Sequence, residues 1–328
     1  MANYKVVDAD QLDADLETVA DAIREKTGRQ ERISFPDEFV SEIEGIEAGI
    51  GGGDDQLNAL IARSIQQVDS TATGVGNYSF YQCTNLTSAR FANATSIGNY
   101  SFYNCTKLPT VEAPLMKTIG SYGLASCIKL TSVDYPVATT LGTYALSGCT
   151  SLTDVYLPML TSLGTSSFRG CTKLARIDLP KASTVAGTSF YGCTALEIAD
   201  FGGAKSVGAQ AFYNCYKLKA LVLRYSDVAT LANINAFTNC YWLKGTTNTT
   251  YNPTGGRGYV YVPRELMGSG TLLGAYERAT NWISAGVQFR ALEDYTLDGT
   301  VFGDLDTEKM LAALEGGGSG GGSGGEIM

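Results

Sequence analysis

The chain has 328 residues, 44 % of them hydrophobic, with 8 Cys, 19 Tyr and no His, which excludes mechanisms that need an imidazole base or a histidine metal ligand. The net charge of −9 arises in residues 1–55, where 15 acidic and 5 basic side chains sum to −10, whereas the remaining 18 acidic and 19 basic residues sum to +1. This distribution offers no basic surface for nucleic acid, and no apolar run reaches the roughly 20 residues that a membrane span needs.

The N-terminal segment carries two predicted helices. Four apolar side chains within residues 12–26 recur at spacings of 4, 3 and 4, the a/d pattern of a coiled coil two heptads long. A second helix is predicted to begin near Pro36, because proline is favoured in the first turn of a helix. The apolar residues that we assign to attachment or oligomerisation are Leu12, Leu16, Val19, Ile23, Phe35 and Phe39.

These helices carry a resemblance to a class of viral proteins. Residues 20–28 and 35–46 resemble the N-terminal attachment segment of tail and other virion proteins of phages that infect Gram-positive bacteria. We therefore interpret residues 1–48 as an acidic attachment or oligomerisation arm and the Gly-rich residues 49–56 as a hinge. The Gly/Ser-rich residues 315–328 are either a natural hinge or an engineered linker.

Eight cysteines recur at a fixed interval and define a repeat. Six intervals are 22 residues and the last is 25, a self-similarity typical of a solenoid. Counted from each cysteine, position +3 is Leu, position −3 is Phe or Leu, and position −8 is a branched aliphatic residue in the first seven units. The cysteines are Cys83, Cys105, Cys127, Cys149, Cys171, Cys193, Cys215 and Cys240.

Each unit also contains a short predicted strand. The order Cys-x-x-Leu-x-x-Val/Ile-x-Leu-Pro, clearest in residues 149–158 and 171–180, alternates apolar residues as a strand with one buried face does. One coil cannot bury its apolar face alone, so neighbouring coils must stack. The predicted fold class is a mainly β solenoid of parallel short strands over residues 57–250, with short N-terminal helices and a C-terminal α/β cap.

The repeat resembles a known family. Residues 119–136, Ile-Gly-Ser-Tyr-Gly-Leu-Ala-Ser-Cys-Ile-Lys-Leu-Thr-Ser-Val-Asp-Tyr-Pro, are similar to the BspA-like, treponemal-type leucine-rich repeat. The similarity covers residues 70–245 approximately and holds over eight units. It implies a solenoid surface used for adhesion and implies no enzymatic activity, so we expect no catalytic residue, metal or cofactor.

Segments outside the repeats are predicted to cover the two ends of the solenoid, because exposed solenoid ends need such covers. Residues 57–74 look like a degenerate first coil without the Cys and Leu columns. The predicted C-terminal cap and extension, residues 251–314, would contain a strand at 259–263, a helix over about 264–283 and a strand around 287–292.

We interpret the cysteines as buried, reduced thiols that fill space in the core. Thiols about 5 Å apart lie within the distance range of a disulfide, but side chains of one column point the same way, so joining them would distort the strands. No Cys-x-x-Cys spacing for zinc is present. A catalytic thiol would lack both exposure and a histidine partner.

Positions that alternate outward on the strands form a charged column. Position +7 reads Arg90, Glu112, Asp134, Tyr156, Asp178, Asp200 and Val222. This column is either a hydrogen-bonding strip for a polar ligand or a cation, or a solvated sheet face whose charge opposes aggregation. The ligand-binding candidates that we select from it are Glu112, Asp134, Tyr156, Asp178 and Asp200.

Tyrosines form a second pattern, at position −5 in Tyr78, Tyr100, Tyr122 and Tyr144, and at position −2 in Tyr81, Tyr103, Tyr191 and Tyr213. Position −2 alternates with the buried Phe/Leu column, so some rings should be at least half exposed. Exposed ring faces suit sugar rings or another protein surface, because tyrosine combines apolar area with a polar tip. Alternatively, each ring packs on its neighbour in the stack. The tyrosine candidates for ligand binding are Tyr78, Tyr81, Tyr100, Tyr103, Tyr191 and Tyr213.

The leading hypothesis is a non-enzymatic phage virion protein, a tail-associated fibre or receptor-binding protein that presents the solenoid to a bacterial surface polysaccharide or protein. No apolar signal sequence follows Met1, so we expect assembly in the host cytoplasm, with the arm bound to other virion proteins. By family analogy we expect a homo-oligomer, and trimers are usual for fibres. The alternatives are a structural spacer or head decoration protein of the virion, or a BspA-type adhesin of the bacterial cell surface.

Overall fold

The computed structural model describes residues 66–267, 275–279, 281–292, 296–297 and 300–301. The predicted arm, hinge and Gly/Ser linker lie outside these residues, so their roles stay predictions. The attachment candidates outside the described residues are Leu12, Leu16, Val19, Ile23, Phe35 and Phe39.

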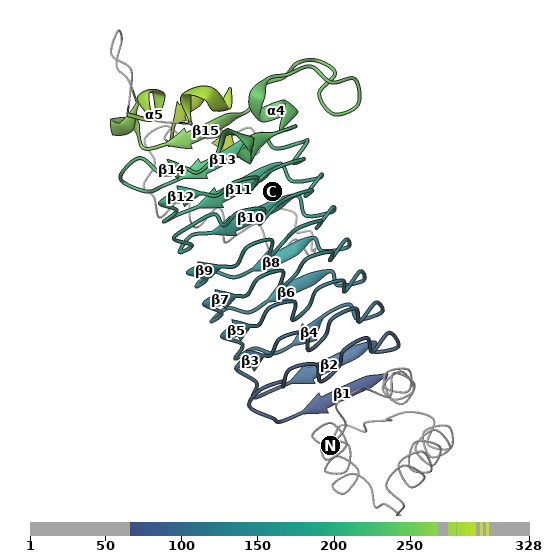
Figure 1. Ribbon diagram of the computed structural model, residues 1–328. Helices are drawn as coiled ribbons and strands as arrows, with labels where there is room; N and C mark the ends of the chain where they lie inside the picture. Colours follow the sequence, from purple (N-terminus) through teal and green to yellow (C-terminus); the bar gives the residue numbers. More distant parts are fainter. Residues whose placement is uncertain (1–65, 268–274, 280, 293–295, 298–299, 302–328) are drawn as a thin grey trace, which may run out of the picture.

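The repeats form a solenoid of parallel strands in which each 22-residue unit makes one coil (Figure 1). One face, which we call the long-strand face, contains β1 and the strands that follow each cysteine. Neighbouring coils pair at equivalent positions, as in Arg90 with Glu112 and Asp178 with Asp200. Its strands within the repeats are β1 (Gln67–Ser70), β2 (Ser88–Phe91), β4 (Val111–Glu112), β6 (Ser132–Asp134), β8 (Asp154–Tyr156), β10 (Arg176–Leu179), β11 (Ile198–Phe201) and β13 (Ala220–Leu223).

A second face, the short-strand face, consists of two-residue strands, each ending in a buried aliphatic residue. They also pair in parallel and in register, as in Ile97 with Ile119 and Leu141 with Leu163. From β3 to β9 the coils therefore repeat with a 22-residue offset, whereas β12 and β14 pair at an offset of 24 residues. Its strands are β3 (Ser96–Ile97), β5 (Thr118–Ile119), β7 (Thr140–Leu141), β9 (Ser162–Leu163), β12 (Ser206–Val207) and β14 (Thr230–Leu231).

Tight turns connect the short strand of each unit to the leucine that follows the cysteine, and we call positions −7 to +3 the turn edge. Its backbone bonds to the next coil, for example from Tyr122 N to Thr143 O at 2.9 Å. A Cβ on Gly164, at position −7, would lie 2.4 Å from the backbone of Gly142. Glycine is used there for close approach of two coils. The turn edge comprises residues 76–86, 98–108, 120–130, 142–152, 164–174, 186–196 and 208–218.

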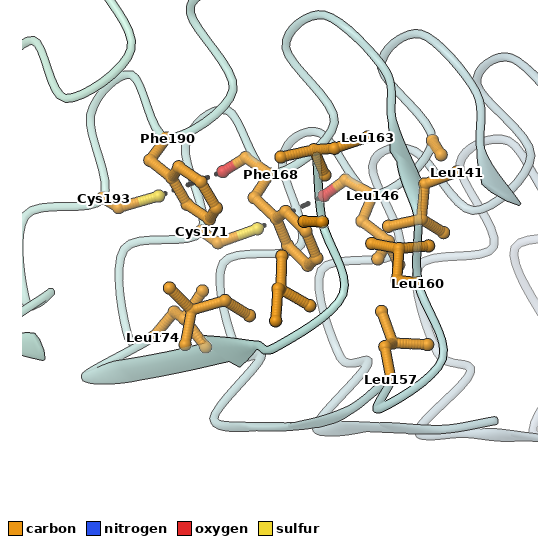
Figure 2. Packing of buried hydrophobic residues seen from close by; sticks show 14 of the residues in the cluster. Leu141, Leu146, Leu157, Leu160, Leu163, Phe168, Cys171, Leu174, Phe190 and Cys193 are labelled. Atoms are coloured by element: carbon orange, nitrogen blue, oxygen red, sulfur yellow. Dashed lines mark hydrogen bonds between the residues drawn. The ribbon is translucent and has the colours of Figure 1, made fainter. Parts of the chain in front are cut away.

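The core lies between the two faces and the turn edge, and each residue type stacks on its equivalent in the next coil (Figure 2). Phe168 and Phe190, for example, are fully buried with ring centroids 5.4 Å apart. Each fully buried Leu or Phe side chain stabilises the fold by about 1.5–3 kcal/mol. Because the layers are nearly identical, stability depends on contacts between neighbouring coils.

The long-strand face continues beyond the last cysteine. Strand β15 (Tyr259–Val262) pairs in parallel with β13, and β16 (Phe289–Ala291) pairs in parallel with β15. The strands predicted at 259–263 and around 287–292 are therefore confirmed.

The continuous helix predicted over residues 264–283 is wrong. The described residues of this range form short helical turns, and glycines at 268, 270 and 274 disfavour a longer helix. The helical elements are η1 (Ile234–Phe237), α4 (Tyr241–Lys244), η2 (Arg264–Leu266), α5 (Ala275–Arg278) and η3 (Ile283–Ala285), and an antiparallel pair follows, β17 (Thr296–Leu297) with β18 (Thr300–Val301).

Candidate binding site

Six tyrosines of the first four units lie in two adjacent columns on the turn edge, and we call them the tyrosine ladder. Rings of the two columns contact each other, with centroids 5.8 Å apart for Tyr78 and Tyr81 and for Tyr100 and Tyr103. The structure therefore joins two columns that the sequence shows only as separate spacings. The ladder consists of Tyr78, Tyr81, Tyr100, Tyr103, Tyr122 and Tyr144.

Within each column the rings stack face to face, with planes within 12° of parallel. The centroid distances are 5.2 Å for Tyr78–Tyr100, 4.7 Å for Tyr100–Tyr122 and Tyr122–Tyr144, and 5.3 Å for Tyr81–Tyr103. Because neighbours cover both faces of an internal ring, ring edges and phenol hydroxyls remain accessible. Packing of each ring on its neighbour, the alternative interpretation, is therefore what the structure shows. The expectation that some rings at position −2 are at least half exposed is wrong, because Tyr81 is 38 % exposed and Tyr103, Tyr191 and Tyr213 are partly buried.

The accessible part of the ladder is greatest at its N-terminal end. Tyr78 is 56 % exposed and Tyr81 is 38 % exposed, whereas the other four rings are partly buried. The pKa of Tyr122 is raised above 10.0 by burial and then by the neighbouring phenols of Tyr100 and Tyr144. The Tyr122 hydroxyl therefore stays protonated at neutral pH, and a phenol O–H can act as a hydrogen-bond donor.

The outer column of the ladder has an unusual backbone. Tyr78, Tyr100, Tyr122 and Tyr144 have φ angles of 60°, 56°, 56° and 56°. Left-handed φ angles cost a residue other than glycine about 1–2 kcal/mol, and a bulky side chain there is an outlier. The same conformation recurs at position −5 of later units, for example in Gln210. The repeat thus imposes a fixed backbone on these tyrosines, which preorganises their rings.

A second aromatic cluster occupies the turn edge of the later units. Tyr191 and Tyr213 stack with centroids 4.9 Å apart, as the spacing at position −2 allows. Tyr216 stacks on Tyr251 at 4.2 Å and on Tyr241 at 5.8 Å. The sequence did not indicate these last three rings, because Tyr251 comes from residues 245–258, outside the 22-residue register.

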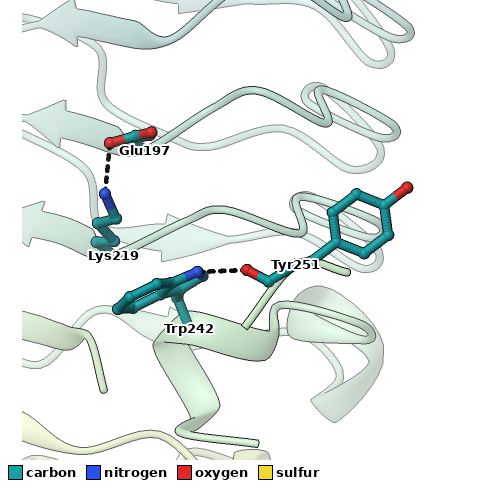
Figure 3. A network of polar contacts seen from close by, with 4 residues as sticks. All are labelled: Glu197, Lys219, Trp242 and Tyr251. Atoms are coloured by element: carbon teal, nitrogen blue, oxygen red, sulfur yellow. Dashed lines mark hydrogen bonds and ion pairs between the residues drawn. The ribbon is translucent and has the colours of Figure 1, made fainter. Parts of the chain in front are cut away.

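Hydrogen bonds fix the loop that carries Tyr251 (Figure 3). Trp242 Nε1 donates to the Tyr251 carbonyl oxygen at 2.6 Å, and the Tyr251 ring points away from the indole. The buried Asn252 side chain donates to Gly256 O at 2.7 Å. Beside the loop, Lys219 Nζ lies 2.7 Å from Glu197 Oε2 and 5.2 Å from the Trp242 ring centroid. The loop therefore holds Tyr251 against the turn edge.

The charged column at position +7 lies on the long-strand face, as expected from its alternation. Glu112, Asp134 and Tyr156 are exposed, and Glu112 Oε2 lies 3.8 Å from Arg90 Nε. An ion pair as exposed as this one adds little to stability. This part of the column therefore matches a solvated, charged sheet face.

In its last units the charged column is buried, so the prediction of outward exposure is wrong there. Asp200 is 1 % exposed, and Arg224 Nε and Nη2 donate to its two carboxylate oxygens at 3.1 and 2.5 Å. Val222 is fully buried in a small apolar cluster with Ala220 and Tyr261. Asp200 is thus a partner of a buried ion pair and is unavailable as a free ligand-binding carboxylate.

Asp178 stands beside this buried pair. Its pKa is raised from 3.8 to about 6, chiefly by burial and then by the Asp200 carboxylate, while Arg176 and Arg224 oppose the shift. The carboxyl is partly buried and paired in register with Asp200. Asp178 is therefore a weak candidate for an exposed acidic ligand.

The eight cysteines form one buried column of free thiols. From Cys105 onward each thiol donates to a backbone carbonyl of the preceding coil, as Cys171 does to Leu146 O and Cys193 to Phe168 O (Figure 2). Burial raises the pKa of Cys193 from 9.0 to about 12. Because the thiolate is the reactive form, these cysteines have a structural role.

Within the part of the chain that the structure describes, no three His, Cys, Asp or Glu side chains are grouped so as to hold a metal ion. Among the same residues, no helix combines the length and apolarity that crossing a membrane requires.

The repeat pattern matches one family model. A BspA type leucine-rich repeat region, in six copies, matches residues 73–197 and 139–251, which together span more than half of the chain. The chain belongs to this BspA-type family. Families of this kind are generally non-enzymatic binding or adhesion proteins, and no catalytic family is indicated. No curated protein matches the sequence.

Solved structures similar to this BspA-type chain are also leucine-rich repeat proteins. One from T. pallidum is 27 % identical, with a TM-score of 0.40 over 47 % of this chain and 72 % of that one. One from Bacteroides ovatus is 18 % identical, with a TM-score of 0.40 over 70 % and 84 %. A leucine-rich cell surface protein of Faecalibacterium prausnitzii is 17 % identical, with a TM-score of 0.27 over 54 % and 71 %.

The BspA-type repeat also carries a basic column that we did not select from the sequence. Position +2 holds lysine in four units, and all four side chains are exposed. The sequence contains the signal for this column, because these lysines are separated by 22, 44 and 44 residues, which are multiples of the repeat length. We call this set the lysine row, and it consists of Lys107, Lys129, Lys173 and Lys217.

Proposed function

We propose that this protein is a non-enzymatic adhesion protein that binds a bacterial surface polysaccharide or protein through the turn edge of its solenoid. The observation that carries the proposal is the tyrosine ladder. Its stacked, partly exposed rings stand on a backbone that the repeat fixes. Rigid aromatic side chains lose little entropy on binding, so such a surface suits contact with another molecule.

The proposal is tested with Tyr81→Ala combined with Tyr103→Ala in the full chain. We expect weaker retention on bacterial cell walls in a pull-down, with a melting temperature close to that of the parent protein. Tyr156→Ala is the matched control, because Tyr156 is 53 % exposed but lies on the long-strand face. Equal loss of binding and of thermal stability in the double variant would identify the two rings as packing residues and contradict the proposal.

We further propose a place for this adhesion in a phage virion, as a tail-associated fibre or receptor-binding protein. The resemblance of residues 20–28 and 35–46 to virion attachment segments supports it. The BspA-type match favours equally an adhesin of the bacterial cell surface. Antibody detection of the protein in purified phage particles, compared with washed cell-surface fractions, separates the two, and retention on cell walls separates both from a virion spacer.

The flanking segments have proposed roles as well. We propose that residues 1–48 attach the protein to other virion proteins as a homo-oligomer, and that residues 251–314 cap the solenoid. The capping role is supported by Trp282, which is buried, donates to Ala229 O at 2.7 Å and contacts the ring of Phe237 in the last repeat. Sedimentation of the full chain against a chain lacking residues 1–48 tests the oligomerisation.

A further inference from the structure

Charge is separated between two sides of the solenoid although the body of the chain is nearly neutral. The seven turn-edge segments contain five basic residues and no acidic residue, the basic ones being Lys107, Lys129, Arg169, Lys173 and Lys217. Six acidic residues of the repeats instead follow the cysteines by four to seven positions, on the long-strand face, and Asp227 follows Cys215 by twelve. The turn edge is therefore a positive side that the net charge of +1 outside residues 1–55 conceals.

Within the described residues, the cations of this side have no carboxylate partner. No ion pair among residues 66–267 involves Lys129, Lys173 or Lys217, and the Lys107 ammonium donates to the amide oxygen of Asn85 at 2.6 Å. Lys219 differs, since it is paired with Glu197 (Figure 3). A row of exposed, like-charged ammonium groups on coils one or two steps apart is a favourable place for an anionic chain.

Tyrosines of the turn edge supply hydrogen-bond donors near these charges. Tyr103 shares a turn with Lys107, and Tyr213 shares one with Lys217, at positions −2 and +2. The Tyr216 ring, at position +1, stacks on the rings of Tyr251 and Tyr241. Arg169, at position −2, lies 4.4 Å from the ring centroid of Tyr191. Because the ring faces are occupied by stacking, the groups left to contact a ligand are phenol O–H and ammonium N–H donors.

We infer that the ligand of the turn edge is an anionic polysaccharide, a chain that carries a carboxylate or phosphate group on successive units. This inference rests on the proposed adhesion function and names its ligand class. The lysine row pairs with the anionic groups, and the phenol hydroxyls of the ladder donate to the same groups or to sugar oxygens. A neutral polysaccharide would leave the ammonium groups without partners and would find the ring faces of the internal tyrosines already covered.

The inference is tested by affinity electrophoresis of the full chain in gels that contain polygalacturonate, poly(glycerol phosphate) or neutral dextran. We expect retardation by one or both anionic polymers, weakening with added salt, and none by dextran. The carboxylate and phosphate arms identify which anion is recognised. Equal retardation by dextran would overturn the inference, and so would equal retardation by single-stranded RNA, which would indicate unspecific attraction to any polyanion.

Matched variants locate the binding surface. Lys129→Gln, Lys173→Gln and Lys217→Gln together should raise the Kd about tenfold, as expected for three lost surface ion pairs. The control removes the same charge from exposed lysines outside the turn edge: Lys117→Gln, Lys181→Gln and Lys205→Gln. Equal weakening by both triple variants contradicts the inference. If the protein binds cell walls but no variant or salt alters that binding, the inference fails while the adhesion function stands.

Discussion

Raising the pH should unfold this solenoid at the point where its buried thiols are forced to ionise. Burial raises the pKa of Cys83, Cys193 and Cys240 from 9.0 to about 12. The folded state therefore holds these protons more tightly than the unfolded state. The stabilisation is fully present below the unfolded pKa of 9.0 and is lost as the pH rises toward about 12.

The magnitude follows from the size of these shifts. At a pH of about 10.5 each of the three thiols costs about 2 kcal/mol, because the unfolded chain is ionised there and the folded chain is not. Together they cost about 6 kcal/mol, which is comparable to the whole stability of a typical domain. Burial shifts the pKa of Cys149, Cys171 and Cys215 upward as well, so the real loss is larger. We expect cooperative unfolding between a pH of about 10 and 11.

The assay combines far-ultraviolet circular dichroism of the full chain with short pulses of iodoacetamide at each pH, followed by mass spectrometry of the intact protein. We expect no labelled thiol below a pH of about 9 and all eight labelled within the transition seen by circular dichroism. In Cys193→Ala one fewer proton is released on unfolding. The free energy of unfolding of this variant should therefore fall with pH less steeply than that of the parent protein, by about 1.4 kcal/mol per pH unit. Labelling of several thiols near pH 9 without loss of structure would refute the reasoning.

Three substitutions test other parts of the structure by urea unfolding. Cys149→Ala should destabilise the fold by about 1–2 kcal/mol, because the core loses a sulfur atom and its hydrogen bond to Leu124 O at 3.2 Å; no change would show that the column is loosely packed. Gln210→Gly should stabilise it by about 0.5 kcal/mol, because φ is 55° there and the relief of strain exceeds the entropy cost of glycine; destabilisation would show that the position is unstrained. Arg224→Met should cost about 3 kcal/mol by leaving Asp200 buried and unpaired, and adding Asp200→Asn should recover most of it; no recovery would show that burial of the charge is not the cause.

The columns of the repeat could be predicted from the sequence because of the 22-residue period. A position assigned to the core in one coil holds the same type of residue in the next coil, which supports the assignment. Once Leu, Phe and Cys recur at fixed offsets, stacking them is the one arrangement that buries all three at once. The orientation of the tyrosine rings could not be predicted. It depends on the left-handed backbone at position −5, and Tyr100 or Gln210 carries no sequence signal for that conformation as Gly or Asn would.

Departures from the period were also beyond prediction. Asp200 follows the alternation that keeps Glu112 exposed, and yet it is buried because Arg224 packs against it from 24 residues further on. Arg224 follows β13 at position +9, a column that holds proline in four earlier units, so no repeated charge marks it as a partner. Tyr251 likewise joins the turn edge without a repeated signal, since residues 245–258 have no counterpart in the other units.

The periodicity also sets the size of the ligand that the turn edge can distinguish. Lys107 and Lys217 are five coils apart, or about 24 Å at about 4.8 Å per coil. The stacked tyrosines of the first four units lie toward one end of this span, and those around Tyr216 lie toward the other, with Arg169 between them. A short oligosaccharide would contact only part of the row, so affinity for an anionic polysaccharide should rise with chain length until the chain spans about 24 Å and then level off. A surface made of one compact pocket would instead reach full affinity with a few sugar units, which distinguishes a binding edge built by repetition from a single site.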